Sequence, residues 1–93
     1  NQNNIPEGYV LYQNYPNPFN PKTKISFSIP KSGFVRLTVY DILGREIETL
    51  VAEKMTAGMH EVGFDGKNLA SGVYFYRLDT DNFTETRKMM LVK

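Results

Sequence analysis

The 93-residue sequence contains no cysteine and no tryptophan, and its only histidine is His60. The absence of cysteine excludes a disulfide framework, a thiolate metal site and a cysteine nucleophile. No serine lies in a G-x-S-x-G elbow, so the sequence does not indicate a serine hydrolase either. Small exported domains are often stapled by disulfides, and this chain must therefore be held together by packing alone.

An excess of charge of one sign and a long hydrophobic run are also missing. Eleven basic and ten acidic residues leave a net charge of +1, and no run of Lys or Arg occurs. This balance argues against a nucleic-acid partner and against an electrostatic membrane anchor. No apolar stretch approaches the roughly 20 residues that a transmembrane segment requires, and no signal peptide is visible. We interpret residues 1–4 as the polar remnant of a linker to a larger protein, and residues 5–93 as one domain.

Alternation of apolar and polar residues with a period of two recurs along most of the chain and predicts β-strands. Ile25, Phe27 and Ile29 give the clearest case, because polar residues separate them. The predicted strands span residues 9–12, 23–29, 34–40, 45–51, 59–64, 73–78 and 83–92. Seven short strands with a turn signal roughly every 8–12 residues predict an all-β, immunoglobulin-like antiparallel sandwich. Spacing alone does not separate this fold from a small barrel.

Three connections carry specific expectations. Gly44 is expected to take a positive φ in a turn over residues 41–44. Residues 52–58 are polar and small, and they are predicted to form a connection with room for one helical turn. The Asp65-Gly66 pair is predicted to end a strand in a tight turn.

Candidates for catalysis and metal binding are few, and each has a structural interpretation that we prefer. His60 stands beside Glu61, but adjacent strand residues point to opposite faces. Glu46 and Glu48 share one predicted face, without the dry pocket that a glycosidase acid needs. The segment 79–82 offers Asp and Asn oxygens for calcium, yet a hairpin turn favours the same residue types. The sequence therefore predicts no catalytic residue, no metal site and no cofactor.

The segment 15–21 (Tyr-Pro-Asn-Pro-Phe-Asn-Pro) holds three of the five prolines and is predicted to be stiff and irregular. It would serve either as a recognition loop or, in the interpretation that we favour, as a rigid plug that caps the sandwich and covers an edge strand. In the second case Tyr15 and Phe19 should point into the end of the core. The six tyrosines also raise the alternative of a carbohydrate-binding surface, although aromatics in a small sandwich are more often core residues.

Six motifs follow one another along the chain. They are LYQNYPNPFNP at 11–21, TKISF at 23–27, VYDILGRE at 39–46, AGMHEV at 57–62, LASGVYFY at 69–76 and KMMLVK at 88–93. In this order they resemble the type A C-terminal sorting domain of the type IX (Por) secretion system. The resemblance extends over residues 5–93.

This resemblance implies a non-catalytic seven-stranded sandwich that lies C-terminal to a passenger protein. It implies delivery of the passenger to the cell surface or the medium, through the periplasm and the outer membrane of a Gram-negative, Bacteroidetes-like bacterium. The partners implied are the secretion translocon, which recognises the domain, and a sortase-like peptidase, which removes it.

The resemblance also assigns candidate residues for sorting recognition. Gly72, Val73 and Tyr74 match the Gly-x-Tyr motif of the family. The terminal strand is matched by Lys88, Met89, Met90, Leu91, Val92 and Lys93. A receptor would read this strand through backbone pairing or through a surface patch. The structural alternative is that Gly72 permits a turn, Tyr74 packs, and the lysines protect an edge strand from aggregation.

Other functions remain open at this point. The chain resembles, more loosely, the immunoglobulin-like domain of flagellar hook-capping proteins over residues 58–64 and 71–78, which would make it a structural spacer. A carbohydrate-binding module is the other alternative. An exposed terminal strand would also allow weak pairing between two copies of the chain.

Overall fold

The computed structural model describes residues 8–93, so the predicted linker at residues 1–4 lies outside the described part. This part of the chain contains strands and turns but no helix, and hence no helix that could cross a membrane. The strands are β1 (Val10–Leu11), β2 (Lys22–Ile29), β3 (Gly33–Tyr40), β4 (Glu46–Met55), β5 (Gly58–Asp65), β6 (Gly72–Thr80) and β7 (Phe83–Leu91).

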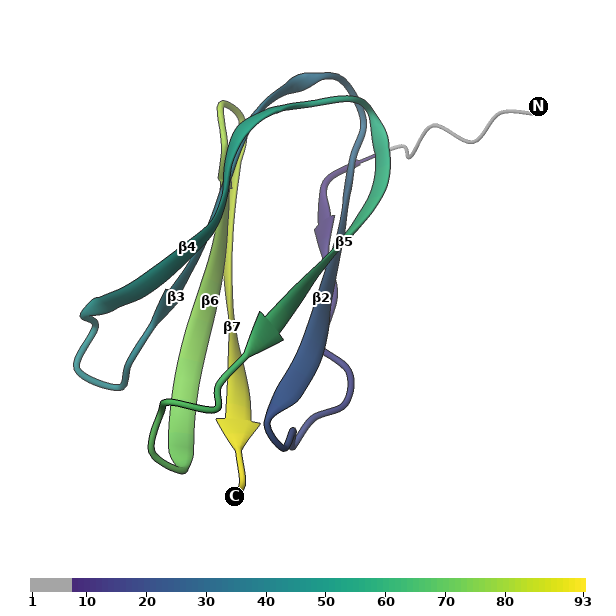
Figure 1. Ribbon diagram of the computed structural model, residues 1–93. Coiled ribbons are helices and arrows are strands. Elements are labelled where there is room, and N and C mark those ends of the chain that lie inside the picture. Colours follow the sequence, from purple (N-terminus) through teal and green to yellow (C-terminus); the bar gives the residue numbers. More distant parts are fainter. Residues whose placement is uncertain (1–7) are drawn as a thin grey trace.

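The strands form two antiparallel sheets that face each other (Figure 1). One sheet has three strands in the order β1-β2-β5, and the other has four in the order β4-β3-β6-β7. The prediction of an all-β sandwich with seven strands is confirmed. Because the hydrogen-bonded ladders form two separate sheets, the barrel alternative is excluded.

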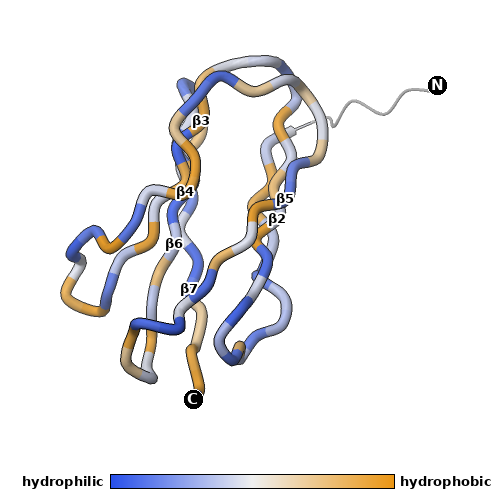
Figure 2. The backbone as a smooth tube through the Cα atoms, in the orientation of Figure 1, coloured by the Kyte–Doolittle hydropathy of each residue, from blue (hydrophilic) through white to orange (hydrophobic). Residues whose placement is uncertain are grey.

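The core lies between the sheets and is built by the alternation seen in the sequence. Ile25, Phe27 and Ile29 of β2 are at most 1% exposed, and the alternate residues of β3 from Val35 to Val39 are fully buried. Figure 2 shows the same pattern as hydrophobic and hydrophilic positions that follow one another along the strands. Each strand therefore supplies one apolar face to the core and one face to solvent or to covering side chains.

Strand β4 is longer than the sequence suggested. Residues 52–55, predicted as part of a connection, continue the ladder to Met55 opposite Gly33. Polar composition was misleading here because β4 lies at the edge of its sheet, where one side of the strand meets solvent. The ladder contains two register shifts, between Leu37 and Thr38 and between Val39 and Tyr40. The turn prediction at Gly44 is confirmed, with φ at 84°.

A buried tyrosine joins the segment before β2 to the core of the four-stranded sheet. The hydroxyl of Tyr76 on β6 accepts a hydrogen bond from the backbone N–H of Asn14 and donates one to the carbonyl of Tyr12, both at 2.8 Å. Tyr76 is fully buried, and burial raises the pKa of its hydroxyl to about 12. The hydroxyl therefore stays protonated and keeps both bonds at neutral pH.

Candidate recognition surface

The two motifs proposed for sorting recognition lie side by side in the structure. The start of β6 pairs with the end of β7, with Gly72 opposite Leu91, Val73 opposite Met90 and Tyr74 opposite Met89. Residues that are far apart in the sequence thus form one two-stranded unit at the pole of the sandwich where the described chain ends (Figure 1).

The alternation of the strands divides these residues between the core and the surface. Tyr74, Met89 and Leu91 face the core and are 8%, 1% and 1% exposed. Met90 and Val92 face outward and are 42% and 45% exposed. The buried members are therefore available to hold the strand in place, and only the outward members can contact a partner in the folded domain.

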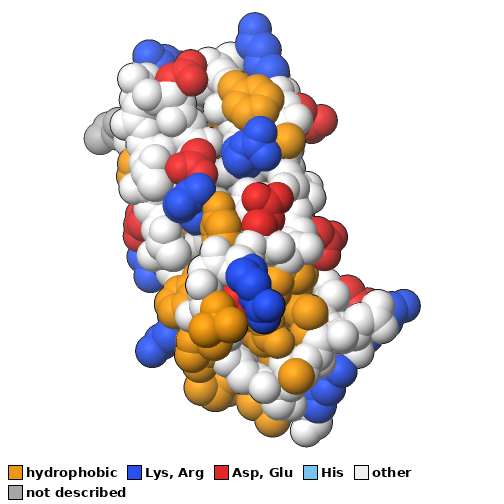
Figure 3. Space-filling view, turned by 90° about the vertical axis from the view of Figure 1, so that its left-hand side faces the viewer, with side chains coloured by type: hydrophobic (Ala, Val, Ile, Leu, Met, Phe, Trp, Pro, Cys, Tyr) orange, Lys and Arg blue, Asp and Glu red, His pale blue; other side chains and the backbone are white. Residues whose placement is uncertain are grey.

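The outward members belong to a larger apolar surface on the four-stranded sheet. The ladder places Val73 beside Met90, and Phe75 beside both Tyr40 and Lys88. We call Tyr40, Val73, Phe75, Met90 and Val92 the outer-sheet patch. Figure 3, which views the side of β3 and β4, shows hydrophobic side chains gathered toward this pole, around a few Lys or Arg side chains.

Gly72 begins β6, and Lys93 follows the end of β7 at the same end of this two-stranded unit. Gly72 has a φ of 150°, a value that favours glycine at the entry to β6. The backbone N–H of Lys93 donates to the hydroxyl of Ser71 at 3.1 Å, and its ammonium donates to the carbonyl of Lys67 at 2.7 Å. Lys93 thus ties the end of β7 to the connection between β5 and β6.

The outer edge of β7 is covered by the proline-rich segment, which we call the head (residues 12–21). Phe19 donates its N–H to the carbonyl of Met90 and accepts from the N–H of Val92, both at 2.9 Å. The N–H of Met90 donates to the side-chain oxygen of Asn17 at 3.0 Å. Since these are the outward-pointing groups of the strand, the last part of β7 has partners on both sides.

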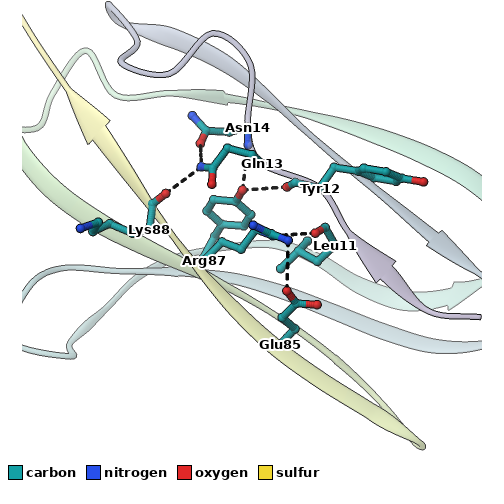
Figure 4. Close-up of polar contacts among 8 residues, drawn as sticks. Leu11, Tyr12, Gln13, Asn14, Glu85, Arg87 and Lys88 are labelled. Carbon is teal, nitrogen blue, oxygen red and sulfur yellow. Dashed lines mark hydrogen bonds and ion pairs between the residues drawn. The ribbon is translucent and has the colours of Figure 1, made fainter.

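The cover extends back along β7 through side chains (Figure 4). The amide of Gln13 donates to the carbonyl of Lys88 at 2.7 Å, and the guanidinium of Arg87 donates to the carbonyl of Leu11 at 2.7 Å. Arg87 also lies 3.4 Å from a carboxylate oxygen of Glu85. Together these contacts close one side of the sandwich.

The head keeps its shape through a buried amide. Asn14 donates to the carbonyl of Pro16 at 3.1 Å and to the hydroxyl of Thr23 at 3.0 Å, and Thr23 donates in turn to Pro16 at 2.9 Å. Phe19 is 1% exposed, so the plug prediction is confirmed for this residue. It is wrong for Tyr15, which is 81% exposed.

The reason for the exposure of Tyr15 is its register. Its backbone exchanges two hydrogen bonds of 3.0 Å with Lys24, and this pairing places both side chains on the outer face of the three-stranded sheet. There Tyr15 borders a groove of about 690 Å³ whose lining also includes Pro16, Gly63 and Asp65. The tyrosines do not form one platform, because Tyr74 and Tyr76 are buried.

The remaining polar candidates have structural partners. The ring of His60 is stacked on Phe27 with the centroids 5.4 Å apart, and its Nε2 lies 2.7 Å from the carbonyl of Thr56. Asp79 forms an ion pair with Arg77 at 2.9 Å. Within residues 8–93, no three His, Asp or Glu side chains are grouped as metal ligands would be.

Sequence reasoning missed the residues that cover β7. Gln13, Asn17 and Phe19 lie in a motif that the sequence does single out, but their target is more than 70 residues away. Periodicity gives the faces of a strand and says nothing about which segment lies against its edge. The surface position of Phe75, beside Lys88, was missed because an aromatic in a central strand is usually a core residue.

Comparison with known proteins adds two kinds of finding. The family model of the secretion system C-terminal sorting domain matches residues 13–93. A crystal structure of dimeric latent PorU from Porphyromonas gingivalis superimposes with a TM-score of 0.70 and 19% identity, over 90% of this chain and 9% of that chain. No curated protein matches the chain.

A second similar structure is PorZ, described as an essential bacterial surface component of the type-IX secretion system of Porphyromonas gingivalis. It superimposes with a TM-score of 0.62 and 19% identity, over 89% of this chain and 11% of that chain. The chain thus spans about a tenth of the length of either protein, and at this identity the two likenesses establish the fold alone.

The family match covers most of the chain and includes every contact between the head and the end of β7 described above. Domains of this family are sorting signals of the type IX system, generally without catalytic activity, and mark the protein that carries them for export through the outer membrane to the cell surface or medium. The chain belongs to the family of secretion system C-terminal sorting domains.

Proposed function

We propose that the secretion translocon reads this sorting domain through side chains on the outer face of β7, and not by adding a strand to its edge. The proposal rests on the head, whose hydrogen bonds cover the outer edge of β7. Strand addition requires free outward N–H and C=O groups, and at Met90 both of these groups are bonded to the head.

The outward side chains of β7 support surface reading in another way. Lys88 and Met90 point away from the core beside Phe75 and Val73, so a receptor meets an apolar surface with a cation next to it. A contiguous exposed apolar area rimmed by polar groups is typical of a protein interaction site. The charge of Lys88 would fix the orientation of the partner more than it would add affinity.

The further partners follow from the same role. A passenger protein precedes the domain in the full-length protein, and a sortase-like peptidase separates the two after export. The domain itself is not an enzyme in this proposal: its histidine is packed on Phe27, Asp65 bonds a backbone N–H in its turn, and Asp41 and Asp79 pair with arginines.

The test is export of a reporter passenger fused before Asn1, in a bacterium with a type IX system. Deleting residues 89–93 would be ambiguous, because Met89 and Leu91 are core residues whose loss also destabilises the fold. The double variant Lys88→Glu/Met90→Ser changes only exposed side chains and is expected to leave the passenger in the periplasm.

The matched control is Lys54→Glu, an exposed charge reversal opposite Phe34 near the other end of the same sheet. It should export normally. Normal surface delivery of the Lys88→Glu/Met90→Ser fusion, with the thermal stability of both variants unchanged, would show that the outer face of β7 is not read.

A further inference from the structure

The turn between β3 and β4 presents two large apolar side chains to solvent. Ile42 is 68% exposed and Leu43 is 74% exposed. No other large apolar residue in the described strands and turns of the four-stranded sheet is as exposed. Turns usually carry polar residues and glycine. Apolar side chains at such a position have no role in the core, and they need another explanation.

The turn is held rigidly by Asp41. One oxygen of its carboxylate accepts hydrogen bonds from the N–H groups of Leu43 and Arg45, both at 2.9 Å. The other oxygen pairs with the guanidinium of Arg45 at 2.7 Å. The N–H of Gly44 donates to the carbonyl of Asp41 at 3.0 Å. The N–H of Arg45 is the main cause that lowers the pKa of the Asp41 carboxyl, so these bonds persist in mild acid.

The turn lies at the same pole as the outer-sheet patch. Strand β3 ends at Tyr40, which pairs with Phe75, and the turn follows directly. Figure 1 shows the β3–β4 turn, the start of β6 and the end of β7 at one end of the molecule. Ile42 and Leu43 therefore add two exposed apolar side chains at the pole that carries the patch.

Charges of both signs lie at this pole, namely the carboxylates of Asp41, Glu46 and Asp65 and the ammonium groups of three lysines. Asp41 is neutralised by Arg45, and the Asp65 carboxylate accepts the N–H of Lys67 at 3.0 Å. Within residues 8–93, Lys67, Lys88 and Lys93 form no ion pair. A partner with carboxylates opposite these ammonium groups is electrostatically complementary, whereas a basic partner is repelled.

We infer that the Ile42–Leu43 turn is a second, unassigned contact of the sorting signal, which inserts into an apolar pocket of the receptor protein whose rim carries carboxylates. The inference rests on the proposed function, because it takes the receptor that reads β7 as the partner. It adds a contact 45 residues upstream of Lys88, on a different strand pair. Rigidity of the turn reduces the entropy lost when the two side chains are buried in the pocket.

The test is the variant Ile42→Ser/Leu43→Ser in the same reporter fusion. Export is expected to fall about tenfold or more, the factor that corresponds to about 1.4 kcal/mol of binding free energy. Thermal unfolding should be unchanged, since both side chains are exposed. The control is Phe34→Ser, which removes a 45% exposed aromatic from the other end of β3 and should export normally.

The charge of the pocket is tested at Lys67, which lies outside the terminal strand. Lys67→Glu is expected to reduce export by about tenfold. Lys67→Arg, which keeps the positive charge, is expected to export at the wild-type level. Equal export of the Glu and Arg variants would refute the acidic rim.

The outcomes separate the inference from the function on which it rests. If Ile42→Ser/Leu43→Ser exports normally and Lys88→Glu/Met90→Ser does not, the turn is not a contact but β7 is read as proposed. If both variants export normally, both proposals are wrong. Failure of all variants including Phe34→Ser would overturn the inference too, because the loss would then not be specific to the turn.

Discussion

At the scale of single residues, one hydroxyl connects the head to the four-stranded sheet. Tyr76 is the only described side chain that bonds two backbone groups of the head, at Tyr12 and Asn14. Tyr76 and Asn14 are buried, whereas Tyr12 is 40% exposed. A buried N–H or C=O that loses its partner costs about 1–3 kcal/mol. The position of the head therefore depends strongly on this residue.

The substitution Tyr76→Phe should lower the free energy of unfolding by about 1–3 kcal/mol, because it leaves both backbone groups without the hydroxyl. Equilibrium urea unfolding measures the change. Tyr15→Phe is the matched control and should shift stability by less than about 0.5 kcal/mol, because its hydroxyl is on an exposed side chain. A midpoint equal to that of the wild type would mean that water replaces the hydroxyl.

The same residue predicts a loss of stability at alkaline pH. Burial raises the pKa of Tyr76 from about 10 to about 12 in the fold, so the unfolded chain loses this proton first as pH rises. The contribution is complete below pH 10 and is lost as the pH rises toward 12, with a limit of about 2.7 kcal/mol. Urea unfolding at pH 9 and pH 11.5 should show a steeper loss for the wild type than for Tyr76→Phe. Parallel losses would contradict the prediction.

At the scale of elements, the end of β7 lies at the edge of its sheet, but its backbone is hydrogen-bonded on both sides, as in an interior strand. Phe19 and Asn17 supply the missing partners on its outer side. Gly66 allows this approach: a side-chain carbon there would lie 3.1 Å from Leu91 and 3.4 Å from the Phe19 ring. Such a cover protects an edge against pairing with other chains, so weak dimerisation through this part of β7 is not favoured.

Amide hydrogen exchange tests the cover directly. The outward N–H groups of Met90 and Val92 are bonded to the head, whereas the outward N–H of Lys88 has no partner within residues 8–93. Met90 and Val92 should therefore exchange more slowly than Lys88. In Asn17→Ala the Met90 amide should exchange about tenfold faster and approach Lys88, with Val92 less affected. Fast exchange of Met90 in the wild type would show that the head is not seated on β7.

At the scale of the whole molecule, the domain is elongated and its two ends differ. Its long axis measures 43 Å. At one end Tyr9 stacks on Phe83 beside the β6–β7 turn, and at the other Lys93 is bonded to Ser71 and Lys67. The described chain thus begins near the pole opposite the outer-sheet patch.

Separation of the two poles predicts that export tolerates changes in linker length. Insertion of a flexible Gly/Ser segment of about ten residues before Asn1 should leave export of a reporter passenger unchanged, since the proposed recognition surface lies at the far pole. The fraction of passenger at the cell surface, measured by protease accessibility, checks this. A marked decrease with linker length would mean that the receptor contacts the passenger junction as well.

Most of the fold could be predicted from the sequence because strand alternation is a local property. The inward residues of β2 and β3 were identified from their spacing alone, and they are the buried ones. Residues 52–55 were misassigned because β4 lies at the edge of its sheet, where one side of the strand meets solvent, and its polar residues there hide the alternation. Tyr15 was misplaced because its exposure depends on its pairing with Lys24, which a proline-rich sequence does not reveal.

The candidate site was only partly predictable for the same reason. The motifs at 72–74 and 88–93 were recognised, but their division between core and surface needed the register of β6 on β7. Alternation predicts two faces for each strand without saying which is buried when both are apolar, as in Met89 to Val92.

The sequence by itself determined the class of fold, the number of strands and the family, since these depend on local periodicity and on motif order. Only the tertiary structure decided what a partner can touch. Contacts between the head and β7, the burial of Met89 and Leu91, and the gathering of Ile42, Phe75 and Met90 at one pole join distant parts of the chain. Such contacts are selected by the packing of the two sheets as a whole, and no local pattern encodes them.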